Sequence, residues 1–515
     1  MKRLKQLSKL LLVTAVVFAG CEGQESSLID DRLENNPLPQ DPAPNYTAGD
    51  ADFSNYIAIG NSLTAGYMDG ALYDAAQQNS LPALIAEQLF VVGSATFTQP
   101  DINSTNGFNT TIENPQNGTI FGRYKLDTSI PGPSPVVGGD LISNYTGAAN
   151  ELNNFGVPGI VVGQLLTPAT GGPNSEQNPA FNPFYQRFAS NPSQDGQTGS
   201  TIIGDAISAQ PTFFSLWIGN NDVLGYAVGG ASNENILTSD GDFQTQFNAT
   251  VDNLMGNTQA DGVVANIPPF LGLAYFRAVP YNPIPIESQQ QADALNDGYQ
   301  DYNNGLAQAR GAGLIDEQEE QRRTIQFSLG ANPFVMEDET LTDLSALGLP
   351  NYRQAESTDL VILSAATAFA TGVGTQSAAG DELVLIPQEQ QEIETKRATF
   401  NGIIADAVDN YSSRLVLYNT NDPAGAFADI FGISDGVPGI RVGGVDLQPD
   451  FSPNGILSTD AIHPNQRGNA ILANEFLKVI EGKFNATLPR VDVLELPSVQ
   501  TCAGDCASQQ AGAGS

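Results

Sequence analysis

Four short apolar runs, each bounded by turn-forming residues, constrain the fold of this chain most strongly. They cover residues 55–60 (NYIAIG), 211–219 (PTFFSLWIG), 262–268 (GVVANIP) and 414–418 (RLVLY). Apolar runs without polar alternation are typical of strands buried on both faces. Helical patterns follow them at residues 81–89, 243–255, 388–408 and 465–484. This alternation predicts an α/β fold with a mostly parallel sheet.

Two long intervals interrupt the alternation. Residues 95–150 are rich in Gly, Asn, Thr and Pro, and residues 270–385 hold mixed segments with few clear elements. Long excursions from a compact core are more often walls or lids of a site than inert loops. We therefore interpret both as insertions in one domain that spans residues 51–490.

The N-terminus has the pattern of an export signal. Basic residues precede an apolar run at 10–19, which is too short to cross a bilayer as a helix of about 20 residues. Cys21 follows Phe-Ala-Gly and resembles the lipidated Cys of a bacterial lipobox, although Phe18 replaces the usual Leu. We expect residues 1–20 to be a lipoprotein signal peptide, residues 21–50 a Pro-rich tether, and the protein an exported lipoprotein of the outer membrane, on its periplasmic or cell-surface face. The alternative is an ordinary signal peptide in which Cys21 has no role.

The charge balance excludes several classes of partner and site. The chain has 21 Lys and Arg against 57 Asp and Glu, a formal net charge of −36 at pH 7. Binding to nucleic acids or to anionic membrane surfaces needs clustered basic residues, so we expect neither kind of binding. Membrane association is expected only through the N-terminal lipid anchor. His463 is the single histidine, which excludes metal sites built on two or three imidazoles. With no P-loop or dinucleotide fingerprint between strand and helix, we expect no cofactor and no metal.

The C-terminal tail, residues 491–515, contains the other two cysteines, Cys502 and Cys506. In an exported chain a local disulfide is the expected state. A redox or metal role would need partner residues that the sequence does not supply.

Three residues have the chemistry of a nucleophile with its base. Ser62 follows the first apolar run in GNSL, at the edge where parallel sheets bind ligands and near a helix N-terminus that favours an oxyanion. Asp460 and His463 lie three residues apart before the last helix, so the carboxylate can hold one imidazole nitrogen and leave the other as a general base. Taken singly, the Ser62 motif is more often a helix N-cap without chemistry, and a lone histidine such as His463 is more often a surface or capping residue.

Two clusters of glycine and asparagine lie between these residues, NFGVPG at 154–159 and GNND at 219–222. Glycine lets a backbone N–H approach a substrate oxygen closely, and an Asn amide can supply a second donor. Each cluster alone is typical of a turn. Their order along the chain favours a shared site.

Taken together, GNSL at 60–63, Gly159, GNND at 219–222 and DAIH at 460–463 resemble the four blocks of the SGNH/GDSL hydrolases, in the family's order and over about residues 55–485. The longer phrases NNFGVPG and LWIGNNDVLG resemble lipoprotein members from Bacteroidetes-type bacteria. The resemblance implies a flavodoxin-like three-layer α/β/α sandwich with a parallel sheet. It also implies a serine esterase or lipase in which Ser62 attacks the ester carbonyl, His463 takes its proton and Asp460 orients His463.

The resemblance further implies an oxyanion hole formed by the backbone N–H groups of Ser62 and Gly159 and by the side chain of Asn221. Gly156 is the alternative glycine donor. The sequence departs from the family at Asn61, which replaces the usual Asp and keeps a hydrogen-bonding side chain without its charge.

Two functions from different classes are consistent with these residues. The first is a lipid-anchored serine esterase that hydrolyses carboxylic esters through an acyl-enzyme, with either a lipid ester or an acetylated polysaccharide as its substrate. The second is a binding lipoprotein that keeps the hydrolase scaffold without turnover.

Overall fold

A five-stranded, all-parallel sheet lies at the centre of the computed structural model, which describes residues 44–129, 132–421, 439–503 and 506. The strands in chain order are β1 (Tyr56–Gly60), β4 (Asn154–Gly156), β5 (Phe213–Trp217), β6 (Asp261–Ala265) and β13 (Leu415–Tyr418). Their spatial order is β13-β6-β5-β1-β4. Numbered along the chain this is 2-1-3-4-5, one of the two common orders of doubly wound α/β sheets.

The prediction of an α/β fold with a parallel sheet is confirmed. All residues of β1 and β5 are buried, which explains why these runs contain no alternating polar positions. β4 was not predicted as a strand, because it has only three residues and its sequence, NFG, is also typical of a turn. The predicted signal peptide, Cys21 and most of the tether lie outside the described residues.

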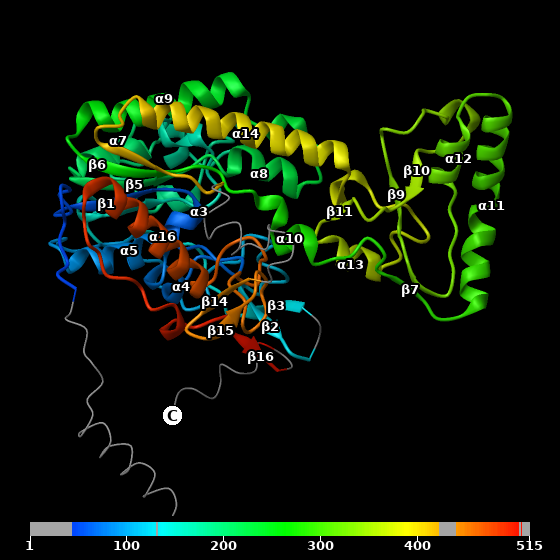
Figure 1. Ribbon diagram of the computed structural model, residues 1–515, viewed down its shortest axis with the longest axis horizontal. Helices are drawn as coiled ribbons and strands as arrows, with labels where there is room; N and C mark the ends of the chain where they lie inside the picture. Colours follow the sequence, from blue (N-terminus) through cyan, green and yellow to red (C-terminus); the bar gives the residue numbers. More distant parts are fainter. Residues whose placement is uncertain (1–43, 130–131, 422–438, 504–505, 507–515) are drawn as a thin grey trace, which may run out of the picture. The chain divides into compact units, whose positions relative to one another are not determined.

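The four predicted helices are present and cover the sheet. Figure 1 shows α9 (Asp240–Asn257) and α14 (Pro387–Asp409) on one face, and α5 (Leu81–Phe90) and α16 (Gln466–Phe484) on the other. This arrangement is compatible with a three-layer α/β/α fold. Three of these helices begin at a polar cap, because the side chains of Ser80, Ser239 and Asn465 each accept a hydrogen bond from a first-turn N–H.

Aromatic rings fill the space between sheet and helices. The rings of Phe243 on α9 and Phe400 on α14 stack with centroids 3.9 Å apart. On the other side, Trp217 of β5 packs against Phe476 of α16 at 5.5 Å. The Trp217 indole is only 2% exposed and donates a hydrogen bond to the carbonyl of Asn266 at 3.1 Å. The carboxyl end of β5 is therefore fixed by core packing.

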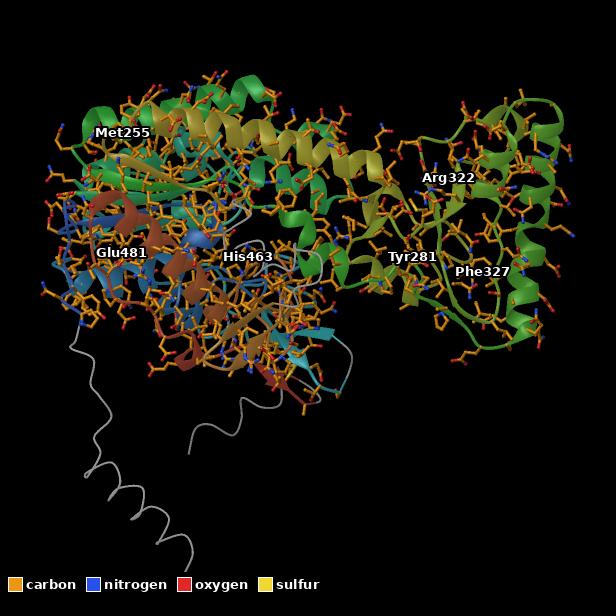
Figure 2. The ribbon with its side chains drawn as sticks, viewed as in Figure 1. Met255, Tyr281, Arg322, Phe327, His463 and Glu481 are labelled. Carbon is orange, nitrogen blue, oxygen red and sulfur yellow. A yellow bond between two sulfur atoms is a disulfide. The ribbon has the colours of Figure 1, made fainter. Side chains whose placement is uncertain are left out.

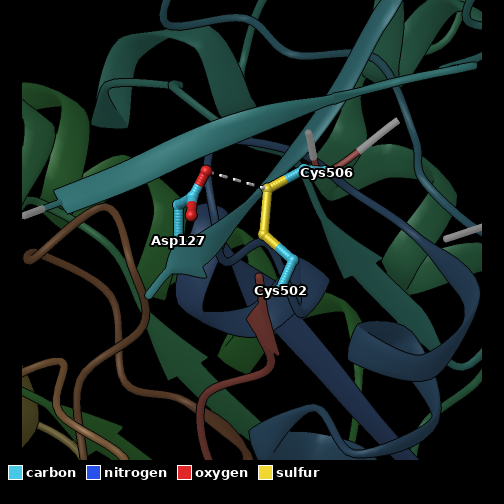
Figure 3. A group of neighbouring side chains, drawn as sticks. All are labelled: Asp127, Cys502 and Cys506. Atoms are coloured by element: carbon cyan, nitrogen blue, oxygen red, sulfur yellow. Dashed lines mark hydrogen bonds between the residues drawn. A yellow bond between two sulfur atoms is a disulfide. The ribbon is translucent and has the colours of Figure 1, made fainter. Parts of the chain in front are cut away.

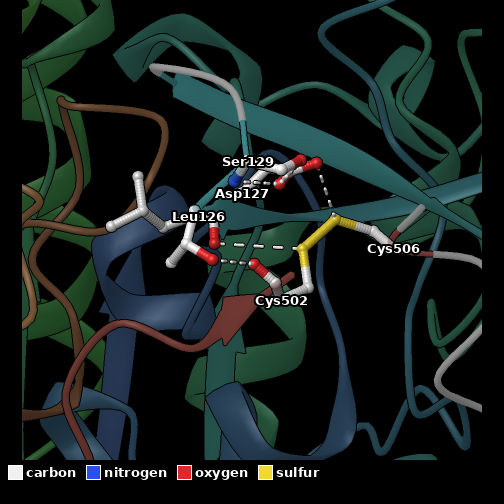
Figure 4. The surroundings of a disulfide bond; sticks show 6 residues. Leu126, Asp127, Ser129, Cys502 and Cys506 are labelled. Atoms are coloured by element: carbon white, nitrogen blue, oxygen red, sulfur yellow. Dashed lines mark hydrogen bonds between the residues drawn. A yellow bond between two sulfur atoms is a disulfide. The ribbon is translucent and has the colours of Figure 1, made fainter. Parts of the chain in front are cut away.

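The first insertion contains a hairpin to which the end of the described chain is attached. β2 (Phe121–Asp127) pairs antiparallel with β3 (Gly132–Val137), and β16 (Thr501–Cys502) adds to β2 in parallel. Cys502 and Cys506 form a disulfide beside Asp127 (Figure 3). The carbonyl of Cys502 accepts a hydrogen bond from the backbone N–H of Thr128 at 2.8 Å. Figure 4 shows the surroundings of the disulfide, at the edge of this hairpin.

The second insertion is more regular than its sequence indicates, so the expectation of few clear elements in residues 270–385 is wrong. It contains the 23-residue helix α11 (Gln289–Gly311) and α12 (Glu317–Arg323). Its short antiparallel pairs are β7 (Ile284–Ile286) with β8 (Gly330–Asn332), β9 (Val335–Glu337) with β10 (Tyr352–Gln354), and β11 (Leu360–Val361) with β12 (Val384–Leu385). These elements enclose a second hydrophobic core, and the labelled residues Tyr281, Arg322 and Phe327 in Figure 2 belong to this segment.

A buried ion pair network stabilises this second core. The side chains of Arg353, Asp338 and Asp359 are all 0% exposed. The Arg353 guanidinium binds both carboxylates, at 2.6 and 2.8 Å to the two oxygens of Asp359. Arg322 adds a second positive charge, 3.1 Å from Asp338. The two buried carboxylates are thus matched by two guanidinium groups.

None of the helices in the described ranges combines the length and apolar character that a membrane span requires.

Removing Arg353 should destabilise the protein strongly. Arg353→Ala leaves two buried carboxylates without their main partner, so we expect the free energy of unfolding to fall by about 3–5 kcal/mol. Denaturant unfolding measures this loss. Arg441→Ala is the control, because Arg441 pairs with Asp446 at the surface with both side chains more than half exposed, and it should leave the unfolding midpoint unchanged. Equal midpoints for Arg353→Ala and wild type would contradict the prediction.

Candidate active site

The structure brings Ser62, His463 and Asp460 into one hydrogen-bonded chain. Ser62 is the first residue of α3 (Ser62–Ala65), immediately beyond β1. His463 lies in the loop before α16 (Figure 2). His463 Nε2 is 2.9 Å from Ser62 Oγ, and His463 Nδ1 is 3.0 Å from Asp460 Oδ2. Residues 401 positions apart in the sequence are therefore in direct contact.

The turn that carries Ser62 depends on two neighbouring residues. A Cβ on Gly60 would lie 2.3 Å from the Trp217 carbonyl oxygen, so only glycine fits at the end of β1. Asn61 is 1% exposed, and its Oδ1 accepts a hydrogen bond from the Leu63 N–H at 3.1 Å as the N-cap of α3. An uncharged side chain serves this capping role, which gives Asn61 a structural function.

Asp460 is held as an ionised acceptor. Its Oδ1 accepts hydrogen bonds from the N–H groups of Ile462 and His463 at 3.0 and 2.9 Å, and its Oδ2 accepts one from Gly70 at 3.2 Å. Burial alone would raise the pKa of Asp460, but the His463 ring and these hydrogen bonds outweigh it and lower the pKa to about 2.

The ionisation of Asp460 fixes the direction of the hydrogen bonds in the chain. A carboxylate only accepts, so His463 Nδ1 donates to Asp460. In the neutral ring the other nitrogen, Nε2, then accepts from the Ser62 hydroxyl. The arrangement can remove the proton of Ser62 Oγ and hold the resulting imidazolium beside a carboxylate.

Asp69 is a second buried carboxylate behind Asp460 that the sequence reasoning missed. Its Oδ1 accepts from the backbone N–H and the hydroxyl of Thr459 at 2.8 and 2.7 Å, and its Oδ2 accepts from the Tyr73 hydroxyl at 2.7 Å. The Asp69 N–H donates to Ser458 Oγ at 3.1 Å. Burial raises the pKa of Asp69. These bonds attach the turn after α3 to the loop that carries Asp460 and His463.

Of the two candidate glycines, the geometry favours Gly159. The Gly156 N–H donates to Asn154 Oδ1 at 2.9 Å, and a Cβ on Gly156 would lie 2.3 Å from the Ala65 nitrogen. Gly156 is therefore occupied in packing β4 against α3. Gly159 has φ +79°, with nothing within 4 Å of where its Cβ would be. An incoming oxygen can approach its backbone from this open side.

Asn221 and Asp222 connect the Gly159 loop to the end of β5. Asn221 is the first residue of α8 (Asn221–Val228), and its Nδ2 donates to the Ile160 carbonyl at 2.8 Å, which leaves its second amide hydrogen for another acceptor. Asp222 is fully buried and accepts from the Val162 N–H at 3.0 Å and the Thr238 hydroxyl at 2.8 Å. Burial raises the pKa of Asp222 to about 7.

A small pocket opens beside the serine and the histidine. Its volume is about 40 Å³, and apolar side chains form most of its wall. The residues that line it are Asn61, Ser62, Leu63, Trp217, Asn220, Asn221, Leu224, Pro268, Pro269, Phe270, Leu273, Ile462, His463, Pro464 and Leu472. Ser62, His463 and Asn221 thus share one pocket. Gly159 does not line it and lies in the loop after β4, the strand next to β1.

Two groups of potential metal ligands occur among the described residues. In the first, Asp127 lies beside Cys502 and Cys506, whose sulfurs are bonded to each other. The second consists of Glu339, Asp381 and Glu389. Burial and the neighbouring carboxylates raise the pKa of Asp381 to about 6, and burial raises that of Glu389 to about 8. At neutral pH a proton therefore neutralises most of Glu389, whereas Asp381 is mostly ionised.

Neither the comparison with protein-family models nor the search of curated proteins found a match to this chain.

Replacing Asp222 with Asn should change how stability depends on pH. The folded pKa of about 7 is above the ordinary Asp value of 3.8, so folding binds a proton that the unfolded chain releases near pH 4. The contribution of the Asp222 carboxyl to the free energy of unfolding is therefore largest below pH 4. It decreases as the pH rises towards 7, by at most about 4 kcal/mol. We therefore compare the melting temperature of Asp222→Asn with that of wild type at pH 5 and at pH 8. The difference, variant minus wild type, should be more positive at pH 8. Asp343→Asn, at an exposed site, controls for the loss of a charge. A difference from wild type that is the same at both pH values would contradict this.

Proposed function

We propose that the protein is a serine ester hydrolase of the SGNH/GDSL type. The observation that carries the proposal is the continuous chain from Asp460 through His463 to Ser62, with contacts of 3.0 and 2.9 Å at the carboxyl end of a parallel sheet. The strand order 2-1-3-4-5 and the four sequence blocks support the family assignment.

The chemistry follows from the positions of the protons. Ser62 Oγ attacks the ester carbonyl carbon while its proton passes to His463 Nε2, and Asp460 stabilises the imidazolium. The tetrahedral intermediate collapses, the ester C–O bond breaks, and the alcohol leaves with the proton from His463. Water then attacks the acyl-Ser62 ester with His463 again as base, which releases a carboxylic acid and restores the serine.

The negative charge on the carbonyl oxygen needs fixed donors. The Ser62 N–H, the Gly159 N–H and the second amide hydrogen of Asn221 are the candidates. Other hydrogen bonds fix the segments that carry these donors. Asn221 donates to the Ile160 carbonyl, and Asp222 accepts from the N–H of Val162, which lies in the loop that contains Gly159. Donors fixed before the reaction stabilise a developing charge without a further cost of reorganisation.

The alternative, a binding lipoprotein without turnover, accounts less well for the same geometry. A binding scaffold has no need for a buried, ionised Asp460 behind the histidine, because desolvating a carboxylate is costly. Export and lipid anchoring through Cys21 are part of the proposal on the sequence pattern alone.

Substitution of Ser62 or His463 should abolish ester hydrolysis. We expect Ser62→Ala and His463→Ala each to lower kcat for p-nitrophenyl acetate by at least about 10³-fold, because each removes a member of one reacting unit. A fluorophosphonate should label wild type covalently and not Ser62→Ala. Ser208→Ala, at an exposed serine on the helix Ile202–Ser208, is the matched control and should behave as wild type. Full activity in a correctly folded Ser62→Ala variant would refute the assignment.

Removal of the Asn221 amide should lower turnover more than binding. We expect Asn221→Ala to reduce kcat by about 10²- to 10³-fold with a small change in KM, because the lost hydrogen bond forms mainly in the transition state. Asn253→Ala, at an exposed position on α9, is the control. A loss of less than threefold in kcat would exclude Asn221 as an oxyanion donor.

A further inference from the structure

The turn after α3, residues 66–73, contacts both the imidazole and the carboxylate of the candidate site. The ring of Tyr67 packs against the ring of His463, with centroids 5.1 Å apart and ring planes at 60°. Two aromatic rings at this separation attract each other. The N–H of Gly70 donates a hydrogen bond to Asp460 Oδ2 at 3.2 Å. The turn therefore holds the ring of the base and its carboxylate partner at once.

Tyr73, at the end of the same turn, reaches the base by a longer route. Its hydroxyl donates to Asp69 Oδ2 at 2.7 Å, and Asp69 Oδ1 accepts from both the N–H and the hydroxyl of Thr459. Thr459 directly precedes Asp460 in the sequence. Neither Tyr73 nor Tyr67 is among the described residues that line the pocket of the candidate site. Both tyrosines thus contact the groups behind the reacting atoms and not the space for a substrate.

The first insertion holds this turn through its backbone. The N–H of Tyr124 donates to the carbonyl of Asp69 at 2.7 Å, and the N–H of Thr110 donates to the carbonyl of Gly70 at 3.1 Å. The hydroxyl groups of Thr110 and Tyr67 also share a hydrogen bond of 2.6 Å. Because the turn lies outside the helices and the central sheet, these bonds supply partners that regular structure does not.

Arg123, on β2 of the first insertion, supports Tyr73. Its side chain is buried, and its guanidinium carbon lies 4.4 Å from the centroid of the Tyr73 ring. Its Nη2 donates to Gln500 Oε1 at 2.8 Å, just before β16, whereas Nε and Nη1 have no hydrogen-bond partner among the described residues. A desolvated guanidinium is attracted to the face of an aromatic ring. Arg123 therefore connects the hairpin of the insertion to the ring whose hydroxyl binds Asp69.

We propose that Tyr67 and Tyr73 are positioning residues for His463, and that the first insertion holds both in place. Thr110 does so for Tyr67, and Arg123 does so for Tyr73. The proposal rests on the proposed ester hydrolysis and gives the insertion a role in it from behind the base. The physical reason is that a reacting group displaced by a fraction of an ångström loses much of its rate.

The rate of fluorophosphonate labelling separates positioning from a merely structural role. The fraction of Ser62 that can be labelled measures how much of the protein is folded. The rate constant of labelling measures the reactivity of Ser62 in the folded molecules. A variant that only destabilises the fold lowers the fraction, whereas a variant that misplaces the base lowers the rate constant.

Tyr73→Phe tests the route through Asp69, because it removes the hydroxyl donor and keeps the ring. We expect the rate constant of labelling and kcat for p-nitrophenyl acetate each to fall about tenfold, with KM within about twofold of wild type. Tyr411→Phe is the matched control, since it also removes a hydroxyl bound to an aspartate, Asp252 at 2.9 Å. It should react as wild type does.

Two variants at Tyr67 test the ring contact with His463. Tyr67→Phe keeps the ring and loses only the bond to Thr110, so the rate constant of labelling should fall about threefold. Tyr67→Ala also removes the ring, and the rate constant should fall at least about tenfold. Equal rate constants for the two variants would contradict a role for the ring.

Arg123→Met tests the contribution of the insertion. It removes the charge from the Tyr73 ring, and the rate constant of labelling should fall about fivefold. Combined with Tyr73→Phe, it should cause no further loss, because both changes act through one contact. Arg414→Met is the control, since the Arg414 guanidinium binds the Met255 carbonyl at 2.8 Å beside the amino end of β13. Losses that multiply in the double variant would overturn the role of the insertion.

The failures of the two proposals are distinguishable. If wild type is labelled and Tyr73→Phe, Tyr67→Ala and Arg123→Met have its rate constant, the positioning inference is wrong while the serine mechanism stands. A lower labelled fraction with an unchanged rate constant overturns the inference in the same way. If wild type hydrolyses no ester and its serine is not labelled, the proposed function fails and the positioning inference fails with it.

Discussion

The contact between the turn after α3 and the loop before α16 is the interaction on which the candidate site depends. Asp69 binds Thr459 twice, its N–H binds Ser458, and Gly70 donates to Asp460. These bonds join segments 390 positions apart in the sequence. His463 and Asp460 both lie in the second of these segments, the loop before α16. A serine on one strand end and a histidine before the last helix meet at 2.9 Å because this junction holds their backbones together.

Burial of carboxylates takes two different forms in this acidic chain. In the second insertion, Asp338 and Asp359 are paired with guanidinium groups, so their charges are balanced where they lie. Around the candidate site, Asp69 and Asp222 instead accept hydrogen bonds from hydroxyl and backbone N–H groups, and burial raises the pKa of both. Of the three carboxyl groups Asp69, Asp222 and Asp460, it is Asp460, next to the imidazole, whose pKa is below the ordinary range. The site thus separates one ionised carboxylate from neighbours that are more easily protonated.

The sequence predicts those parts of the structure that local pattern determines. β1, β5, β6 and β13 and the helices that follow them could be predicted because strands buried on both faces have an unmistakable composition. α11 could not, because it is largely polar and only Ala292, Tyr302, Leu306 and Ala309 of its 23 residues are buried. Asp69 was missed for another reason: its role exists only through contacts with residues 389–390 positions away. The resemblance already selects Gly159, with Gly156 as the alternative, and the bond from the Gly156 N–H to the Asn154 side chain is a reason for that choice which the sequence does not contain.

The imidazole between Asp460 and Ser62 is the single one in this chain. Every imidazole signal in a magnetic resonance spectrum of this protein therefore comes from the candidate site itself, without residue assignment or isotope editing. Ionisation of the ring, occupation of the pocket and acylation of the serine can each be followed at one nucleus. The residue that would perform the proton transfer is also its own spectroscopic probe.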